Sequence, residues 1–210
     1  EGAGLTYRGY DVRDLAKNCK SFEEVAYLLW YGKLPNQAEL DAYVERLKGM
    51  RDLPQALKEV LERIPADAHP MDVMRTGVSV LGTLEPELSF DQQLDVADRL
   101  LASMPAMLLY WYHFSHNGKR IDCMTDEPDL AGHFLALLHG KSPSDLHREV
   151  MNVSLTLYAE HEFNASTFTG RVCASTLSDL YSCITGSIGS LRGPLHGGAN
   201  DAAMDLIDRF

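Results

Sequence analysis

Histidine is the residue type whose placement in this chain most invites a chemical role. Eight histidines occur in 210 residues. His196 lies in the stretch LRGPLHGGAN, behind Pro194 and ahead of two consecutive glycines. Proline fixes one backbone dihedral, and glycine permits backbone conformations that other residues avoid. The stretch therefore indicates either an ordinary turn or a histidine that is presented to a substrate.

His161 lies in a second polar stretch, AEHEFNASTFT, where one helix is expected to end and another to begin. Asn164 and Ser166 follow it closely. Helix ends leave backbone groups unpaired, so such a junction suits a ligand that carries carboxylates. The alternative is a plain helix cap formed by Asn164 or Ser166. The residues alone leave both interpretations open.

Metal binding is the other chemistry that histidines can support. The stretch HEFNA begins like the zinc-protease pattern H-E-x-x-H, but Ala165 stands where the second histidine is required. His113 and His116 are three residues apart, yet no acidic residue or cysteine stands beside them at ligand spacing. We therefore expect no metal site.

The glycines at 186, 189 and 193 do not form a phosphate-binding loop, because no strand precedes them and the Lys–Ser pair is absent. Small residues instead favour the close approach of two helices. We expect such a contact here, with Gly186 and Gly189 at a subunit interface.

The composition, with 45% hydrophobic and 23% charged residues, is that of a soluble globular protein. A formal net charge of −11 disfavours general binding to nucleic acids or membrane surfaces. The longest apolar run, residues 104–114, is shorter than the ~20 residues of a membrane span.

The sequence shows no signal-peptide pattern and begins without an initiator methionine. We expect a cytoplasmic protein whose N-terminus has been cut. The four cysteines form no C-x-x-C pair and are expected to be reduced, mostly packed thiols.

Residues typical of helix starts and helix ends recur along the chain and predict an all-α fold of nine or ten helices. Capping-box patterns occur at residues 21–24 and 36–39, and Pro54 and Pro70 open two more helices. Residues 4–10 are compatible with one short strand. Further helices are expected at residues 91–104, 105–117, 129–139, 144–160 and 167–191.

Four stretches together resemble the citrate synthase family, in the family's order and from one end of the chain to the other. They are LTYRGY at residues 5–10, HPMDVMRT at 69–76, HEFNAS at 161–166 and GPLHGGAN at 193–200. Within the family, LLYWYHFSHNGKRI and YAEHEFNASTFTGRV are most similar to the bacterial 2-methylcitrate synthase branch.

The resemblance implies condensation of an acyl-CoA with oxaloacetate, followed by thioester hydrolysis. The 2-methylcitrate branch implies propionyl-CoA as the acyl donor, in propionate breakdown. His196 matches the histidine that hydrogen-bonds the thioester carbonyl while a carboxylate removes the α-proton. His161 matches the histidine that binds oxaloacetate, Asn164 is expected beside the same substrate, and Ser166 is expected to orient His196. No cofactor is implied, because the acyl-CoA is a substrate, and a homodimer is expected.

The resemblance also implies a division of the chain. Residues 1–195 match the family's large helical domain, and residues 196–210 match the start of its small domain. The second catalytic histidine, the catalytic aspartate and the arginines that hold oxaloacetate lie in family sequence beyond Phe210. We therefore expect the chain by itself to be inactive.

Two other functions stay open at this point. One is a citrate synthase that prefers acetyl-CoA, because one methylene in a pocket is worth only ~1–3 kcal/mol. The other is a helical dimerisation module without chemistry.

Overall fold

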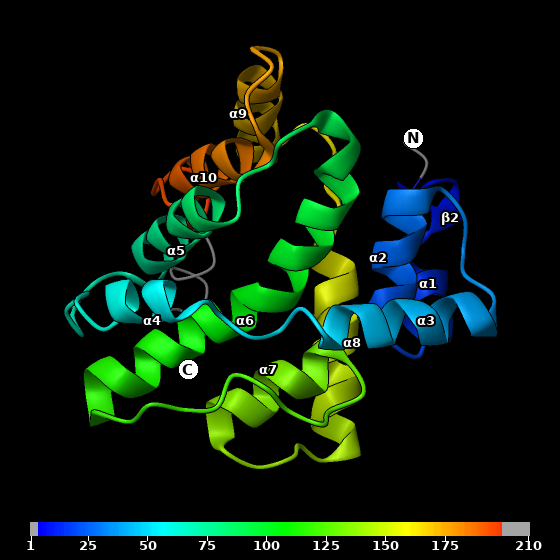
Figure 1. Ribbon diagram of the computed structural model, residues 1–210. Helices are drawn as coiled ribbons and strands as arrows, with labels where there is room; N and C mark the ends of the chain where they lie inside the picture. Colours follow the sequence, from blue (N-terminus) through cyan, green and yellow to red (C-terminus); the bar gives the residue numbers. More distant parts are fainter. Residues whose placement is uncertain (1–3, 199–210) are drawn as a thin grey trace. The chain divides into compact units, whose positions relative to one another are not determined.

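The computed structural model describes residues 4–198 of the chain (Figure 1). These residues divide into two compact units, and each unit is assembled from three separate segments. Unit 1 comprises residues 4–53, Asp98–Tyr110 and Arg120–His161, and unit 2 comprises Pro54–Ala97, Trp111–Lys119 and 162–198. The predicted division at residues 195 and 196 stays a prediction.

The described residues form ten α-helices, which confirms the expected all-α class. Unit 1 contains a two-stranded antiparallel hairpin, β1 (Thr6–Tyr7) and β2 (Tyr10–Asp11), with α1 (Val12–Asn18), α2 (Phe22–Tyr31), α3 (Gln37–Lys48), α7 (Leu130–His139) and α8 (Asp145–Tyr158). Unit 2 contains α4 (Gln55–Leu61), α5 (Pro70–Leu84), the 3₁₀ turn η1 (Phe90–Gln92), α9 (Ala165–Ala174) and α10 (Leu180–Leu191). Residues of α6 (Gln93–Asn117) contribute to both units.

Local capping chemistry explains where several helices begin. Both expected capping boxes are present, at Ser21 before α2 and at Asn36 before α3. Gly32 ends α2 in the left-handed conformation, with φ of 78°. His69 caps α5 by accepting a hydrogen bond from the Met71 amide through Nδ1 at 3.1 Å.

The structure corrects one expected helix boundary at Pro105. We expected two helices, at residues 91–104 and 105–117, but α6 continues through this proline. An interior proline costs about 3 kcal/mol. Ala102, Ala106 and Met107 beside it are fully buried, and that burial offsets the missing backbone hydrogen bond.

A second correction concerns the helix expected over residues 167–191. The structure instead has two helices, α9 and α10, joined by a turn. Leu177 in that turn has a φ of 64°, which interrupts helical geometry. Asp179 then caps α10, because its Oδ1 accepts a hydrogen bond from the Ser182 amide at 2.9 Å.

The apolar core of unit 1 lies where α1, α2, α3, α7 and part of α6 meet. Its members share nearly complete burial, and they are Tyr7, Val12, Leu15, Phe22, Val25, Ala26, Leu28, Tyr43, Leu47, Ala102 and Leu130.

Arg51 adds a buried polar anchor to unit 1. Only 2% of its surface is exposed. Its guanidinium donates to the backbone carbonyls of Thr125, Glu127 and Asp129 at 3.1, 2.8 and 3.3 Å. One side chain thereby holds most of the segment that leads into α7.

Asp129 links three helices of unit 1. Its Oδ1 accepts from the Gly132 amide at 2.7 Å and from Arg148 on α8 at 3.0 Å. Its Oδ2 accepts from Asn152 at 3.1 Å, and Asn152 in turn accepts from the Phe22 amide at the start of α2. These bonds fix the starts of α2 and α7 against α8.

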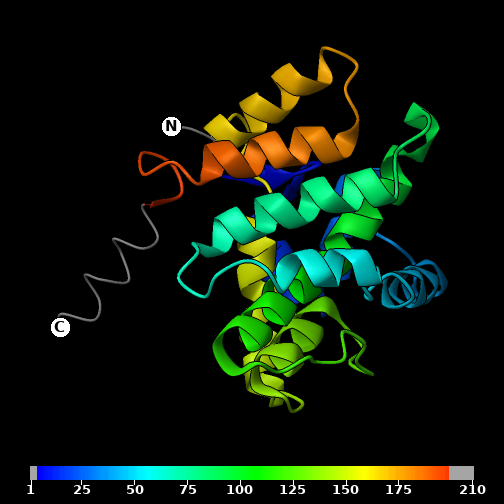
Figure 2. The ribbon, with the colours of Figure 1, turned by 60° about the vertical axis from the view of Figure 1, so that its left-hand side comes forward.

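Helix α10 is the central element of unit 2. It packs against α9 on one side and α5 on another, as Figure 2 shows. The amide of Leu180, at the start of α10, donates to Glu87 Oε2 at 2.6 Å. Trp111 is 2% exposed, and its Nε1 donates to the Ile64 carbonyl at 3.2 Å. None of the helices within residues 4–198 is both long and apolar enough to span a membrane.

Candidate functional site

The loop after α10 carries His196 on consecutive tight turns. The amide of Gly193 donates to the Ser190 carbonyl at 3.1 Å, and the amides of His196 and Gly197 both donate to the Gly193 carbonyl. A Cβ atom at position 197 would overlap the Leu191 carbonyl oxygen, so this position requires glycine. The glycine that follows His196 therefore lets the loop fold back onto the end of α10.

A chain of hydrogen bonds connects His196 to the start of α9. His196 Nε2 lies 2.9 Å from the hydroxyl of Ser166 and 3.3 Å from its amide. The Ser166 hydroxyl lies 2.7 Å from Asn164 Oδ1, which also accepts from the Thr167 amide at 2.8 Å. Asn164 is thus the N-cap of α9. The structure brings His196, Ser166 and Asn164 together from positions 30 residues apart.

The Ser166 hydroxyl can point in two directions within this hydrogen-bond network. The Ser166 amide donates to Nε2 at 3.3 Å, so Nε2 is an acceptor even when the Ser166 hydroxyl turns toward Asn164. With the hydroxyl turned toward His196, Nε2 is the acceptor, and a neutral imidazole carries its proton on Nδ1. Both of the described hydrogen bonds of the His196 ring are made at Nε2.

His161 belongs to unit 1 and is described there by itself. It follows the end of α8 and is exposed. Its Nε2 lies 2.7 Å from the Leu157 carbonyl, one of the carbonyls that lack a partner within the helix. The expected pairing of His161 with Asn164 around one substrate stays a prediction.

A cluster of charged side chains that was not predicted from the sequence lies beside the His196 loop. Asp72 on α5 accepts from Arg192 Nε at 3.4 Å and pairs with Arg75 at 3.1 Å. Arg192 directly follows α10, so the ion pair connects the C-terminal end of α10 to the first turn of α5. Only the spacing of Arg75 from Asp72 was visible in the sequence, because Arg192 is 120 positions away.

A cavity of about 460 Å³ opens beside this loop. Its lining residues come from the start of α5 and from the segment that carries His196; they are His69, Met71, Leu191, Arg192, Pro194, Gly197 and Gly198. Arg192 gives this space a cationic side chain, which favours an anionic ligand.

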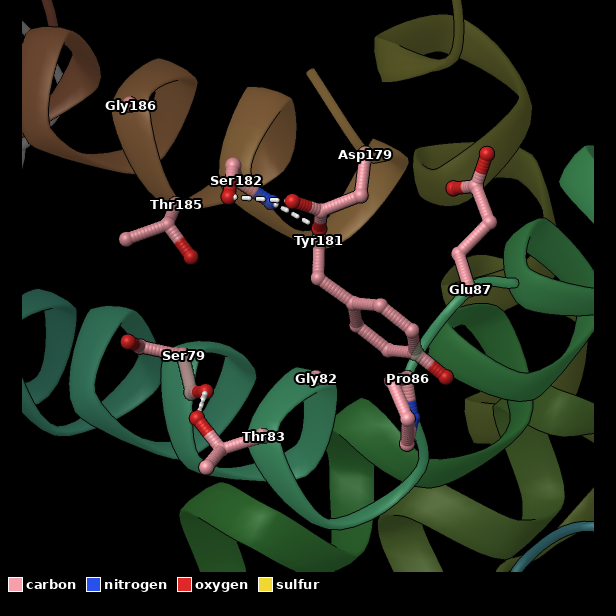
Figure 3. Close-up of a pocket in the computed structure, with 10 residues that line it drawn as sticks. All are labelled: Ser79, Gly82, Thr83, Pro86, Glu87, Asp179, Tyr181, Ser182, Thr185 and Gly186. Atoms are coloured by element: carbon pink, nitrogen blue, oxygen red, sulfur yellow. Dashed lines mark hydrogen bonds between the residues drawn. The ribbon is translucent and has the colours of Figure 1, made fainter. Parts of the chain in front are cut away.

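A second cavity of about 510 Å³ lies between α5 and α10 (Figure 3). Half of its ten lining residues carry hydroxyl groups; the lining consists of Ser79, Gly82, Thr83, Pro86, Glu87, Asp179, Tyr181, Ser182, Thr185 and Gly186. Figure 3 shows Thr185 facing Ser79 and Thr83 across the space. No site residue expected from the sequence lies in this lining.

His133 is a histidine with a structural role. His133 is fully buried on α7, and its Nδ1 lies 3.0 Å from the Thr125 hydroxyl. Burial, together with the nearby charge of Arg51, lowers the pKa of His133 to about 3, so the ring is neutral. Within residues 4–198, no three or more His, Cys, Asp or Glu side chains are grouped to hold a metal ion.

Gly186 and Gly189 make contacts within unit 2. A Cβ atom at Gly186 would lie 3.6 Å from Thr169 on α9, and one at Gly189 would lie 3.8 Å from Arg75 on α5. The expected close helix–helix approach is therefore made inside the chain. Their place at a subunit interface stays a prediction.

Comparison with known proteins gives the same family along the entire chain. The model of the citrate synthase C-terminal domain matches residues 1–210. A 2-methylcitrate synthase from Shewanella oneidensis is 72% identical over 206 residues, covering 98% of this chain and 55% of that protein. Citrate synthase 2 of Bacillus subtilis is 42% identical, covering 97% of this chain and 55% of that protein.

Solved structures of citrate synthases have the same fold as this chain. A citrate synthase from Thermoplasma acidophilum, in a ternary complex with carboxymethyl coenzyme A and oxaloacetate, superposes with a TM-score of 0.88 at 30% identity. That match covers 96% of this chain and 53% of that one. The chain thus spans about half the length of the relatives it matches. The four sequence stretches, the helical architecture and these matches together show that the chain belongs to the citrate synthase family.

Proposed function

We propose that the complete protein is a 2-methylcitrate synthase: it condenses propionyl-CoA with oxaloacetate and hydrolyses the thioester to give 2-methylcitrate and CoA. The observation that carries this proposal is the 72% identity to a 2-methylcitrate synthase over 98% of the chain. A role in cytoplasmic propionate breakdown belongs to the same proposal.

His196 is the residue of this chain that acts on the acyl-CoA. The α-proton of a thioester is a weak acid, and its removal requires a base together with a donor that stabilises the enolate oxygen. When Ser166 donates to Nε2, the Nδ1 proton of His196 is free to point at the thioester oxygen. Ser166 is thus a positioning residue, and its backbone amide supports the same arrangement at 3.3 Å.

The substrate oxaloacetate is assigned to His161 and Asn164. Oxaloacetate carries two carboxylates. Asn164 caps the N-terminus of α9, where the helix dipole favours an anion. His161 follows the C-terminal end of α8, where the dipole does not favour an anion, so its imidazole would act on the substrate as a hydrogen-bond donor. The base and the arginines that complete the site are expected in the remainder of the protein, so the chain alone should show no turnover.

We also propose that the complete protein is a homodimer. Four large apolar side chains between the end of α5 and the start of α6 are exposed, which suits burial against a second subunit. They are Leu84, Leu88, Phe90 and Leu94. Replacing Leu88, which is 81% exposed, with glutamate is expected to lower the dimer fraction in sedimentation.

The decisive test is the release of free CoA by the complete protein, measured as kcat/KM with propionyl-CoA and with acetyl-CoA. A higher value for propionyl-CoA is expected. A higher value for acetyl-CoA would make the protein a citrate synthase, the activity named for the 42%-identical Bacillus subtilis relative.

The residue assignment has its own test, the substitution His196→Ala. Turnover should be abolished while the melting temperature stays within a few degrees, because His196 is half-buried on a surface loop. Unchanged turnover with a large loss of stability would assign His196 a structural role and favour the non-catalytic helical module.

A further inference from the structure

Two cysteines face each other across the α9–α10 hairpin. Cys173 lies on α9 and is half-buried, and Cys183 lies on α10 and is 4% exposed. The thiol of Cys183 donates to the Ser178 carbonyl at 3.9 Å, and an interaction with the Cys173 side chain adds to burial in raising its pKa. Neither thiol has a role in the chemistry assigned to His196.

The two helices pack closely beside Gly170, one turn before Cys173: a Cβ atom at Gly170 would lie 3.8 Å from the Cys183 carbonyl oxygen. A Cβ atom at Gly170 would lie 2.6 Å from Ser187 Oγ, and one at Gly186 would lie 3.6 Å from Thr169. Packed helix axes usually stand 8–10 Å apart, and glycine permits less. A disulfide needs Cα atoms about 4.4–6.8 Å apart, so close helix approach is what a bridge between two helices requires.

Antiparallel helices fix which residues are opposite. Gly170 faces Ser187, and moving one turn toward the connecting turn brings Cys173 opposite Cys183. Figure 2 shows α9 packed against α10.

We propose that Cys173 and Cys183 are a site of reversible oxidation, closing to a disulfide when the protein meets a hydroperoxide. The more exposed Cys173 reacts first: its sulfur attacks the peroxide, giving a sulfenic acid and an alcohol or, from hydrogen peroxide, water. The sulfur of Cys183 then attacks the sulfenic sulfur, the S–S bond forms, and water leaves. Two thiols are oxidised by two electrons, and one peroxide is reduced.

The order of the two steps follows from the surroundings. Burial raises the pKa of the Cys183 thiol to about 11, so little thiolate is present there at neutral pH. Cys183 is therefore suited to resolving a sulfenic acid at its side rather than to attacking a peroxide from solution.

The disulfide would cross-link α9 and α10, the two helices that position the candidate site. Ser166 lies in the first turn of α9, and His196 follows α10. A bridge between Cys173 and Cys183 keeps the two helices in register. Amide hydrogen exchange in the turn at residues 175–179 is expected to slow on oxidation.

Peptide mapping tests the proposal directly. Trypsin cleaves after Arg171 and Arg192, and no lysine or arginine lies between them, so both cysteines fall in one peptide of residues 172–192. The complete protein is treated with hydrogen peroxide, alkylated and digested. We expect this peptide to be lighter by two hydrogens and unalkylated, and dithiothreitol should restore alkylation of both cysteines.

Matched variants separate the roles of the two thiols. Cys183→Ser should abolish the bridge and let a sulfenic acid accumulate at Cys173, where dimedone traps it. Cys19→Ser is the control, because Cys19 is also half-buried but lies in unit 1, and it should leave the bridge intact. Peptide 172–192 with both thiols still alkylated, or with Cys173 over-oxidised and no bridge, would overturn the proposal.

Discussion

Glu23 is a carboxylic acid buried at the junction of α2 and α7, with 1% of its surface exposed. Its Oε1 accepts from the Leu130 amide at 2.6 Å, whereas Oε2 has no hydrogen-bond partner among residues 4–198. Burial raises the pKa of Glu23 from 4.5 to about 7, and the charge of Asp129 acts in the same direction. Glu23 therefore exchanges its proton near neutral pH.

This raised pKa predicts a pH dependence of stability. The folded state binds the proton more tightly than the unfolded state, so the stabilisation is complete below pH 4.5 and is lost as the pH rises to about 7. The effect amounts to about 3 kcal/mol, since one pKa unit is worth about 1.4 kcal/mol. Glu23→Gln keeps an acceptor for Leu130 but cannot ionise. In urea unfolding, the variant should gain stability relative to the parent between pH 5 and pH 8; parallel pH profiles would contradict this.

Asn164 allows its capping role to be separated from substrate binding. Asn164→Ala removes the acceptor that serves Ser166 and Thr167 and should cost about 1 kcal/mol of stability. Asn164→Asp keeps the acceptor and suits a helix N-terminus, so its melting temperature should not fall.

The same aspartate variant reports on oxaloacetate. A carboxylate in place of the amide should repel the anionic substrate, and we expect KM for oxaloacetate to rise while stability is retained. An unchanged KM would leave Asn164 as a cap alone.

The residues of the candidate site were partly predictable from the sequence. The unusual backbone at His196 followed from its proline and glycine neighbours, and the resemblance named Ser166 as its partner. The ion pair of Arg192 with Asp72 was not predictable, because no local pattern relates residues that far apart along the chain.

At the scale of elements, the contact of α5 with α10 depends on one glycine. A Cβ atom at Gly82 would lie 2.5 Å from the Cβ of Tyr181, a buried residue of α10. Gly82→Ala should push the helices apart and cost about 1–3 kcal/mol.

Gly186→Ala is the matched control on α10. Its new methyl group would meet Thr169 at 3.6 Å, an ordinary contact, and alanine is the better helix former by about 1 kcal/mol. Its melting temperature should hold or rise while that of Gly82→Ala falls. Equal melting temperatures for the two variants would refute the close-contact argument.

Helix starts were more predictable than helix ends and interruptions. Each of the capping boxes of α2 and α3 lies within four consecutive residues, so the sequence shows it directly. The break between α9 and α10 depends on a positive φ at Leu177, which leucine adopts only where the surrounding structure demands it. The short helix α1 was not predicted, although Asp11 before it is a capping residue.

At the scale of the whole chain, α6 is shared by both units and should couple their stabilities. Arg51→Ala removes three hydrogen bonds to backbone carbonyls and should destabilise unit 1 by at least about 3 kcal/mol. If unit 1 unfolds, the middle of α6 loses its packing. Trp111, which lies on α6 and belongs to unit 2, should then be packed less firmly.

Hydrogen exchange measures this coupling. In Arg51→Ala, amides of α5 should lose protection along with those of α2. Arg13→Ala is the control, because the ion pair of Arg13 with Asp11 is exposed and its loss should change neither unit. Unchanged protection in α5 would mean that the units unfold separately.

The all-α class was predictable because it is the sum of many local signals. The two interleaved units were not, because they are defined by contacts between segments that lie far apart along the chain. One such contact within unit 1 is the hydrogen bond from the Tyr7 hydroxyl to the Thr156 carbonyl at 2.8 Å.

The interleaving also sets an order during synthesis. The ribosome delivers the chain from its N-terminus, and a unit closes only when its last segment has emerged. Unit 1 has all its segments once His161 is out of the exit tunnel, whereas unit 2 still waits for the α9–α10 hairpin. A nascent chain halted near residue 161 thus contains every segment of the first unit, whereas the second unit still lacks its central helix.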